Sequence, residues 1–275
     1  MFGWGIYDFL GGVFSKQIGS FKSLFWSQLA GLISILLIAF IFKVEINVPI
    51  LAIVLFPVAS IVYSAGYLFF FKGFERGNVS IIAATMNLWA VFTMLFAFIF
   101  MGQRLTTAQT IGVFMIIAGA TLASIDWGSI GNQKLRLSLG VKEAILGAFF
   151  FGIFWNISEI ISEEIGWLLT TLLVKFGIAI FLLIFSFVRK QEVGLMNSTT
   201  KTKYVILLMG IIEVGAVALV NYGLTIGDAI LITPIASALS IVTIILAVIF
   251  LKDKVSRFQG FGVCMAIVGI ITTAF

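Results

Sequence analysis

Long apolar runs alternate with short polar clusters along the whole of this chain. Each run is near the roughly 20 residues that an α-helix needs to cross about 30 Å of hydrocarbon, rather than the roughly 10 residues of a barrel strand. The pattern therefore predicts an all-α polytopic membrane protein with ten transmembrane helices. The predicted helices cover residues 2–18, 24–42, 49–71, 79–101, 108–125, 141–161, 168–188, 204–225, 229–250 and 258–275.

The second half of this pattern repeats the first. Gly227 lies 150 residues after Gly77, and no gap is needed to keep this step from about residue 65 to the C-terminus. The recurring positions are Gly73, Gly77, Gln109, Gly112, Val113, Met115, Ile117 and Gly119, matched by Gly223, Gly227, Gln259, Gly262, Val263, Met265, Ile267 and Gly269. Nearer the N-terminus the step is 147 residues, as between Gly19 and Gly166, which fits a change in loop length.

Five predicted helices fall in each half of the chain. An odd number of spans forces the second half to enter the membrane in the opposite orientation, so we predict a 5+5 inverted repeat. The predicted division is residues 1–127 for the first five-helix repeat, 128–140 for the connector and 141–275 for the second repeat. Repeats of this kind are typical of transporters that bind their substrate near the midplane, where the halves meet.

The composition is typical of a protein that lies in a lipid bilayer, and it argues against several classes of function. Hydrophobic residues make up 61% of the chain, charged residues only 11%, and the mean hydropathy is +1.19. The sequence has no histidine, no acids clustered at ligand spacing and no phosphate-binding glycine loop. We therefore expect no enzyme activity, no metal site and no cofactor. The formal charge of +5 lies in the loops, where it indicates topology rather than nucleic-acid binding.

Several motifs resemble a known family. They are the run 4–12 with Ser15 and Lys16, the run 27–31, and the closing pattern 102–106 with Gln109, Gly112 and Gly119, echoed by 252–256 with Gln259, Gly262 and Gly269. Over essentially the whole chain they are similar to the EamA family of the drug/metabolite transporter superfamily. The family usually carries Glu where this chain has Gln103, and Asp253 stands there in the second copy. This departure puts any role for that acid in doubt.

The resemblance implies a fold and a class of activity. It implies ten helices around a central cavity lined mainly by the first, third, fourth, sixth, eighth and ninth. The fifth helix of each half is implied to stand outside as a brace. Members of the family mostly export small metabolites, and some import them.

Four charged side chains lie well inside the predicted helices, away from their ends: Asp8, Glu159, Lys175 and Glu213. Each costs roughly 2.5 to 3.5 kcal/mol at the bilayer centre, so we expect each to face a hydrated cavity or a partner. Asp8 is either a cation or proton site or an acid hydrogen-bonded to a neighbouring helix. Lys175 either meets a substrate anion or pairs with a carboxylate, and the alternative for Glu213 is an ion pair with Lys175. Glu159 shares a helix face with Asn156, and we predict that both reach the cavity.

Polar residues recur at equivalent depths in the two halves. Gln28 aligns with Lys175 at the step of 147, and Asn87 aligns with Ser237 at the step of 150. Thr233 lies on the same helix face as Ser237. These positions predict a polar lining for the cavity, with hydroxyl-mediated helix packing as the alternative.

Aromatic residues and a proline complete the candidate set. Trp89 and Trp155 fall within predicted helices and are cavity walls or core residues, and Pro234 removes a backbone donor and frees a carbonyl for the cavity. The predicted substrate-binding or coupling residues are Asp8, Gln28, Asn87, Trp89, Trp155, Asn156, Glu159, Lys175, Glu213, Asn221, Thr233 and Ser237.

Glycines recur two turns apart in the last predicted helix of each half. They are Gly112 and Gly119 in the first copy and Gly262 and Gly269 in the second. Spacing of small residues predicts close helix packing, with a dimer interface as the alternative. The chain is accordingly expected to be a monomer or a homodimer.

The basic residues give a lopsided topology signal. Loops after odd-numbered helices hold Lys16, Lys22, Lys72, Arg76, Lys134, Arg136, Lys142, Arg189, Lys190, Lys201, Lys203, Lys252, Lys254 and Arg257. The other loops hold only Lys43 and Arg104. The positive-inside rule therefore places both termini outside the cytoplasm, whereas the family resemblance implies that both are cytoplasmic.

These observations predict a secondary-active transporter in the plasma membrane, in contact with the lipid bilayer. The predicted cargo is a small polar metabolite such as an amino acid, exported by alternating access, with coupling to protons as an option. The alternatives are an importer of a sugar or another metabolite, and a non-transporting membrane scaffold.

Overall fold

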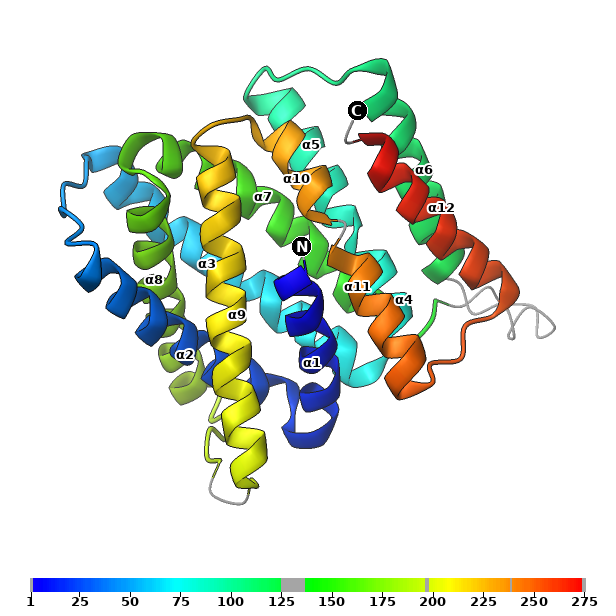
Figure 1. Cartoon of the computed structure of the whole chain (residues 1–275), viewed down its shortest axis with the longest axis horizontal. Helices are drawn as coiled ribbons and strands as arrows, with labels where there is room; N and C mark the ends of the chain where they lie inside the picture. The colour runs from blue at the N-terminus through cyan, green and yellow to red at the C-terminus, as the bar shows by residue number, and fades with distance from the viewer. Residues whose placement is uncertain (1, 125–136, 196–197, 238, 274–275) are drawn as a thin grey trace.

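The computed structural model describes residues 2–124, 137–195, 198–237 and 239–273. Within these ranges the regular structure is entirely helical (Figure 1). The helices are α1 Phe2–Ile18, α2 Ser20–Ile41, α3 Ile50–Arg76, α4 Val79–Met86, α5 Leu88–Phe100, α6 Thr107–Ser124, α7 Val141–Ile165, α8 Trp167–Val188, α9 Thr200–Leu224, α10 Ala229–Ser237, α11 Leu239–Leu246, η2 Ala247–Leu251 and α12 Arg257–Thr273. Residues 125–136 lie outside the described residues. They include most of the predicted connector, 128–140, and the basic residues Lys134 and Arg136.

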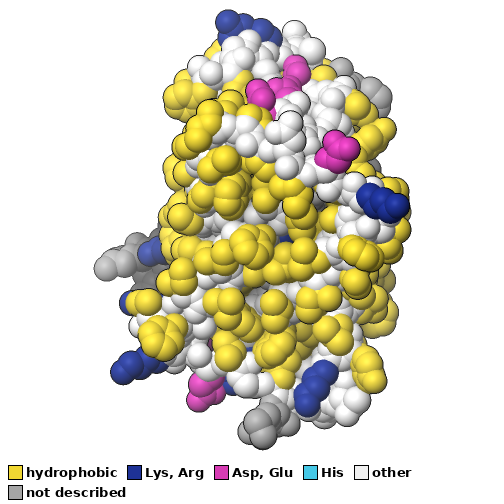
Figure 2. Space-filling model, turned by 90° about the vertical axis from the view of Figure 1, so that its left-hand side faces the viewer, with side chains coloured by type: hydrophobic (Ala, Val, Ile, Leu, Met, Phe, Trp, Pro, Cys, Tyr) yellow, Lys and Arg dark blue, Asp and Glu magenta, His cyan; other side chains and the backbone are white. Residues whose placement is uncertain are grey.

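The all-helical prediction is confirmed, and seven helical stretches of the described chain are long and apolar enough to cross a membrane. Two of the seven, 79–100 and 229–251, are made of consecutive shorter helices. Two further apolar helices, α6 and α12, are shorter. Figure 2 shows hydrophobic side chains over the middle of one face and charged side chains toward its upper and lower ends, as expected for a surface that faces lipid.

The helix predicted at 79–101 is interrupted at one position. It breaks at Asn87, whose N–H donates to Ala84 O at 3.3 Å and whose carbonyl accepts from Ala90 N at 3.1 Å, an i to i+3 turn. Hydropathy cannot reveal this break because both flanking segments are apolar. The equivalent stretch in the second half, 229–251, runs over residue 238, which lies outside the described residues. Discontinuous helices are characteristic of transporter folds built from repeats.

Connections at the two ends of the bundle differ in charge. Figure 1 places the α8–α9 and η2–α12 connections at the lower edge and the α7–α8 and α9–α10 connections at the upper edge. The lower two carry or adjoin Arg189, Lys190, Lys201, Lys203, Lys252, Lys254 and Arg257, and the upper two carry or adjoin Glu163, Glu164 and Asp228. The lower end is therefore the basic one.

Close packing of the recurring glycines is confirmed. Helices α6 and α12 lie side by side at the edge of the bundle (Figure 1). A Cβ on Gly112 would lie 2.6 Å from Gly269 O, and one on Gly262 would lie 2.6 Å from Gly119 O. The two contacts exchange under the 150-residue step, so the repeats meet here across a local two-fold relation. The brace position of these helices agrees with the family resemblance.

Substituting Gly262 by Ala is expected to destabilise the protein. The new Cβ would meet backbone atoms of Ala123 and Gly119 at 2.6 Å, which cannot move without separating α6 from α12. We expect the midpoint of thermal unfolding in detergent to fall by about 5 °C. Gly260→Ala is the matched control, because its Cβ would meet only Val255 Cγ1 at 4.0 Å. An unchanged midpoint for Gly262→Ala would contradict this packing.

Candidate functional site

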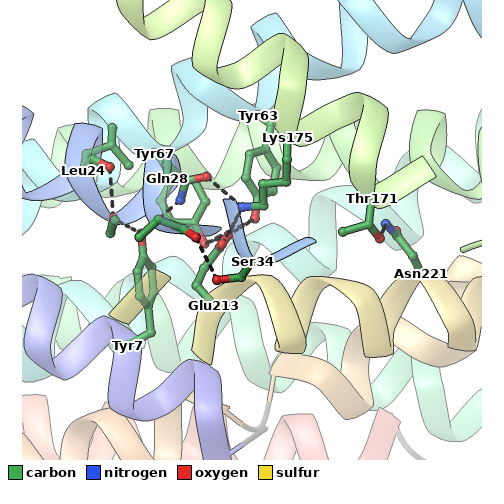
Figure 3. A network of polar contacts seen from close by, with 12 residues as sticks. Tyr7, Leu24, Gln28, Ser34, Tyr63, Tyr67, Thr171, Lys175, Glu213 and Asn221 are labelled. Carbon is green, nitrogen blue, oxygen red and sulfur yellow. Dashed lines mark hydrogen bonds and ion pairs between the residues drawn. The ribbon is translucent and has the colours of Figure 1, made fainter. Parts of the chain in front are cut away.

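A buried network of charged and polar side chains lies between α2, α3, α8 and α9 (Figure 3). Lys175 Nζ donates to both carboxylate oxygens of Glu213, at 2.6 Å for Oε1, and to Gln28 Oε1 at 2.7 Å. Tyr63 OH donates to Glu213 Oε1 at 2.7 Å, and Tyr67 OH lies 3.4 Å from the same oxygen. The Lys175 and Glu213 side chains have 0% exposure, so neither faces lipid. The ion pair considered for Glu213 and Lys175 is formed.

The network continues to α1 through Gln28. Its Nε2 donates to Tyr7 OH at 3.2 Å, and Tyr7 OH lies 3.2 Å from Ser27 Oγ. Ser27 Oγ in turn donates to Leu24 O at 2.9 Å. The buried charges of Lys175 and Glu213 are thus directed to each other and to neighbouring polar side chains, which is what a low-dielectric interior requires.

Residues related by the repeat bond to each other in this network. Gln28 and Lys175 are 147 residues apart, and Tyr63 and Glu213 are 150 residues apart. Two equivalent positions touch only where the axis relating the copies passes between them. The pseudo-two-fold axis therefore runs through this network. The step of 150 already pairs Tyr63 with Glu213 in the sequence, a signal that the sequence analysis missed.

A narrow cavity lies beside the network, with a volume of about 40 Å³. Tyr63 and Tyr67 of α3 belong to both, since their rings line the cavity and their hydroxyl groups reach Glu213. Helix α1 contributes Trp4 and Asp8. Four of the predicted site residues line this cavity: Asp8, Asn87, Trp89 and Trp155.

The break at Asn87 adjoins the cavity. Asn87, between α4 and α5, lines it together with Ser240, near the start of α11. The Nδ2 of Asn87 and the Nε1 of Trp4 are buried donors without an acceptor among the described residues. Such unpartnered donors beside a cavity are available to a ligand or to water.

The lining differs in one respect from what the resemblance implies. Residues of α1, α3, α4, α5, α7 and α11 line the cavity, but none of α9, the eighth predicted helix, does. Glu213 of α9 lies behind the tyrosines instead. The carbonyl that Pro234 frees, that of Ile230, also belongs to a residue outside the lining.

Other predicted site residues join helices outside the cavity lining. Asn156 Nδ2 donates to Thr93 O at 3.1 Å and so links α7 to α5. Asn221 accepts from Ser158 at 2.8 Å and donates to Thr171 at 2.9 Å, which ties α9 to α7 and α8. Thr233 Oγ1 donates to Ala229 O at 2.7 Å within α10, and the backbone carbonyl of Ser237 accepts from Ser240 Oγ at 3.1 Å.

Glu159 of α7 lies against the N-terminus of α10, and Figure 1 shows that α10 lies toward the upper edge of the bundle. Its Oε1 accepts from Ala229 N at 3.0 Å and from Gln103 Nε2 at 2.9 Å, and Gln103 Oε1 accepts from Ile230 N at 3.2 Å. Helix N-termini present free N–H groups and a partial positive charge, so they favour such acceptors. Glu159 Oε2 is buried without a partner among the described residues. We call this set, Gln103, Glu159 and the first amides of α10, the upper contact.

An equivalent contact closes the opposite end. Asp253, the repeat counterpart of Gln103, accepts from Ser80 N at 2.9 Å and Ser80 Oγ at 3.2 Å at the start of α4. Asn78 Nδ2 also donates to Lys254 O at 3.3 Å. We call this set the lower contact. The upper contact joins the first repeat to the start of α10, and the lower contact joins the second repeat to the start of α4. The sequence did not reveal this role.

The recurring glutamines have a local role. Thr106 N donates to Gln109 Oε1 at 2.8 Å and Gln109 N donates to Thr106 Oγ1 at 3.1 Å. Ser256 and Gln259 make the same reciprocal pair at 3.1 and 3.3 Å. These are capping boxes that start α6 and α12, so the repetition of this glutamine reflects helix initiation.

Comparisons with known proteins agree with this architecture. A model described as the EamA-like transporter family matches residues 1–125 and 138–275, which confirms the resemblance carried by the motifs. A solved crystal structure superposes with a TM-score of 0.69 over 98% of this chain and 94% of the other, at 15% sequence identity. At that identity the likeness concerns the fold alone. The search of curated proteins found no match.

Proposed function

Because this chain belongs to the EamA-like transporter family, a family of membrane transporters, we propose that it is a secondary-active transporter working by alternating access. We propose small polar metabolites such as amino acids as cargo, export as the direction and the plasma membrane as the location. We also propose ten crossings, with α1, α6 and α12 spanning the bilayer in addition to the seven longer stretches. Five crossings in each half give the two repeats opposite orientations.

The observation that carries the proposal is the equivalence of the two end contacts. Gln103 holds the start of α10 at the upper end, and its counterpart Asp253 holds the start of α4 at the lower end. The cavity lies between these ends and next to the pseudo-two-fold axis. An architecture with two equivalent closures about one site has two equivalent open states, one for each side of the membrane. The described conformation has both closures formed.

When the repeats rock, one of the two contacts breaks while the other stays formed. Opening the upper end separates Gln103 from Glu159 and from the start of α10, while Asp253 stays on α4. Opening the lower end does the reverse. The Lys175–Glu213 network lies on the axis, where atoms move least during such a rotation. Its contacts therefore stay formed while the two repeats turn about it. The unpartnered Glu159 Oε2 makes this carboxyl our candidate for a proton taken up or released as the upper contact opens.

The lining of the cavity suits a small solute. Its walls are mainly aromatic, and Asp8, Asn87 and Ser240 are the polar residues among them. Apolar walls with a few polar groups are the usual composition of small-molecule sites. This composition supports a small metabolite as cargo.

Flux through purified protein tests the proposed function. Proteoliposomes preloaded with unlabelled amino acids, amines or hexoses should accumulate the matching labelled solute by counterflow, saturably and above protein-free liposomes. Counterflow requires alternating exposure of one site and needs no knowledge of the coupling ion. Absence of protein-dependent counterflow over the whole panel would contradict transport and favour the scaffold alternative. Counterflow with neutral hexoses alone would favour the sugar transporter.

A further inference from the structure

We propose that the cavity is a binding site for a monovalent organic ammonium ion without a carboxylate group, with Asp8 as its anionic partner. The inference rests on the proposed transport function and changes its example of cargo, from amino acids to amines that carry no carboxylate. It starts from a charge that the protein leaves unmatched. Asp8 lines the cavity, is 6% exposed, and receives no hydrogen bond from any described residue.

No described cation is available to neutralise Asp8. The residues that line the cavity include no lysine or arginine. Lys175, the buried lysine nearest the site, is bound by Glu213 and Gln28 behind the wall. That pair is neutral as a unit, so Asp8 is the acidic group that the cavity leaves without a counter-charge. A buried carboxylate without a partner is costly, and a cationic ligand removes that cost.

The walls offer the second element of cation recognition. Trp155 makes edge contacts with Trp4, with ring centroids 5.5 Å apart, and lies 6.0 Å from Trp89. Its ring is also 6.5 Å from that of Tyr63. Faces of such rings attract ammonium groups within about 6 Å of the centroid. Tyr63 already receives one cation in this way, since Lys175 Nζ lies 5.2 Å from its centroid.

The other polar groups of the cavity determine what the ligand can carry besides its ammonium group. They favour a neutral group over an anionic one. The unpartnered donors of Trp4 and Asn87 are uncharged. They can satisfy a hydroxyl, ether or carbonyl oxygen, but they supply no positive charge to offset a carboxylate. A zwitterionic amino acid would bring its carboxylate into a cavity that is already negative. The site therefore discriminates by the net charge of the solute.

Binding of three matched aromatic probes tests this assignment. Phenethylamine, phenylalanine and 2-phenylethanol differ in charge and share a phenyl ring, and their binding to protein in nanodiscs is followed by tryptophan fluorescence and calorimetry. We expect phenethylamine to bind at least about tenfold more tightly than the other two. Asp8→Asn should remove this preference by lowering phenethylamine affinity about tenfold. Glu163→Gln, at the exposed end of α7, is the control and should leave it unchanged.

The outcomes separate this inference from the transport proposal. Equal or tighter binding of phenylalanine, no binding of any amine, or unchanged amine affinity in Asp8→Asn would overturn the inference, with thermal unfolding checking that the variant is folded. Loss of all counterflow in Asp8→Asn with amine affinity intact would also overturn it, because Asp8 would then act in coupling. Amine binding without counterflow would uphold the site and contradict transport.

Discussion

Replacing Lys175 by Met should lower the midpoint of thermal unfolding by about 10 °C. Removing the ammonium group leaves the Glu213 carboxylate fully buried, with only Tyr63 and Tyr67 donating to it. Breaking a buried pair in this way costs about 3 to 5 kcal/mol, since the remaining charge keeps its desolvation penalty. The measurement is unfolding of the purified protein in one detergent, followed by light scattering and tryptophan fluorescence.

The double variant Lys175→Met/Glu213→Gln distinguishes loss of the ion pair from the cost of leaving the Glu213 charge without a partner. A neutral glutamine can still accept from Tyr63 and no longer needs a cation, so the double variant should be more stable than Lys175→Met alone. Lys72→Met is the matched control, because Lys72 pairs with Glu75 at 3.0 Å on the surface, where such pairs contribute about 1 kcal/mol or less. A Lys175→Met protein as stable as the Lys72→Met protein would contradict the role of the pair at the axis.

The sequence predicted the parts of the fold that depend on local pattern. Apolar runs of spanning length located the helical segments, because the bilayer admits few other structures. The recurrence of Gly112 and Gly119 as Gly262 and Gly269 predicted close packing, because only glycine permits the backbone approach that α6 and α12 make. The alignment of Gln28 with Lys175 also placed two residues at equivalent depth, and they bond to each other.

Features that depend on contact between distant segments were not predicted. The break at Asn87 interrupts a stretch that is apolar on both sides, so no change of hydropathy marks it. The capping of α10 by Gln103 and of α4 by Asp253 joins residues 127 and 173 positions apart. A single sequence carries no record of such pairs. Gln103 replaces the glutamate that is usual in the family, so the sequence did not indicate that this residue holds one end closed.

Some site residues lie apart from the cavity for a physical reason. A polar residue inside a helix must find a partner, and a neighbouring helix supplies one as well as a ligand does. Asn156 and Asn221 find theirs across helix interfaces. Asp8 differs because its carboxylate finds no donor among the described residues. The sequence shows which residues need a partner, and the fold shows which of them still lack one.

Locking either end contact should abolish transport. Gln103 and Glu159 belong to different repeats and meet at 2.9 Å, as do Ser80 and Asp253 at 3.2 Å. Each pair can be replaced by two cysteines in a background where the exposed Cys264 is Ala. Bridging the thiols with mercuric ion would hold one end shut, so the cavity could open only to the other side. Counterflow needs both openings.

The control bridge lies within one repeat. Thr199 and Thr202 are 3.0 Å apart at the exposed start of α9, and bridging them should leave transport unchanged. Counterflow in proteoliposomes, measured before bridging, after bridging and after reduction by excess thiol, tests the alternating-access account most directly. The account predicts that each end bridge stops counterflow and that thiol restores it, whereas continued counterflow through protein bridged at either end would contradict it.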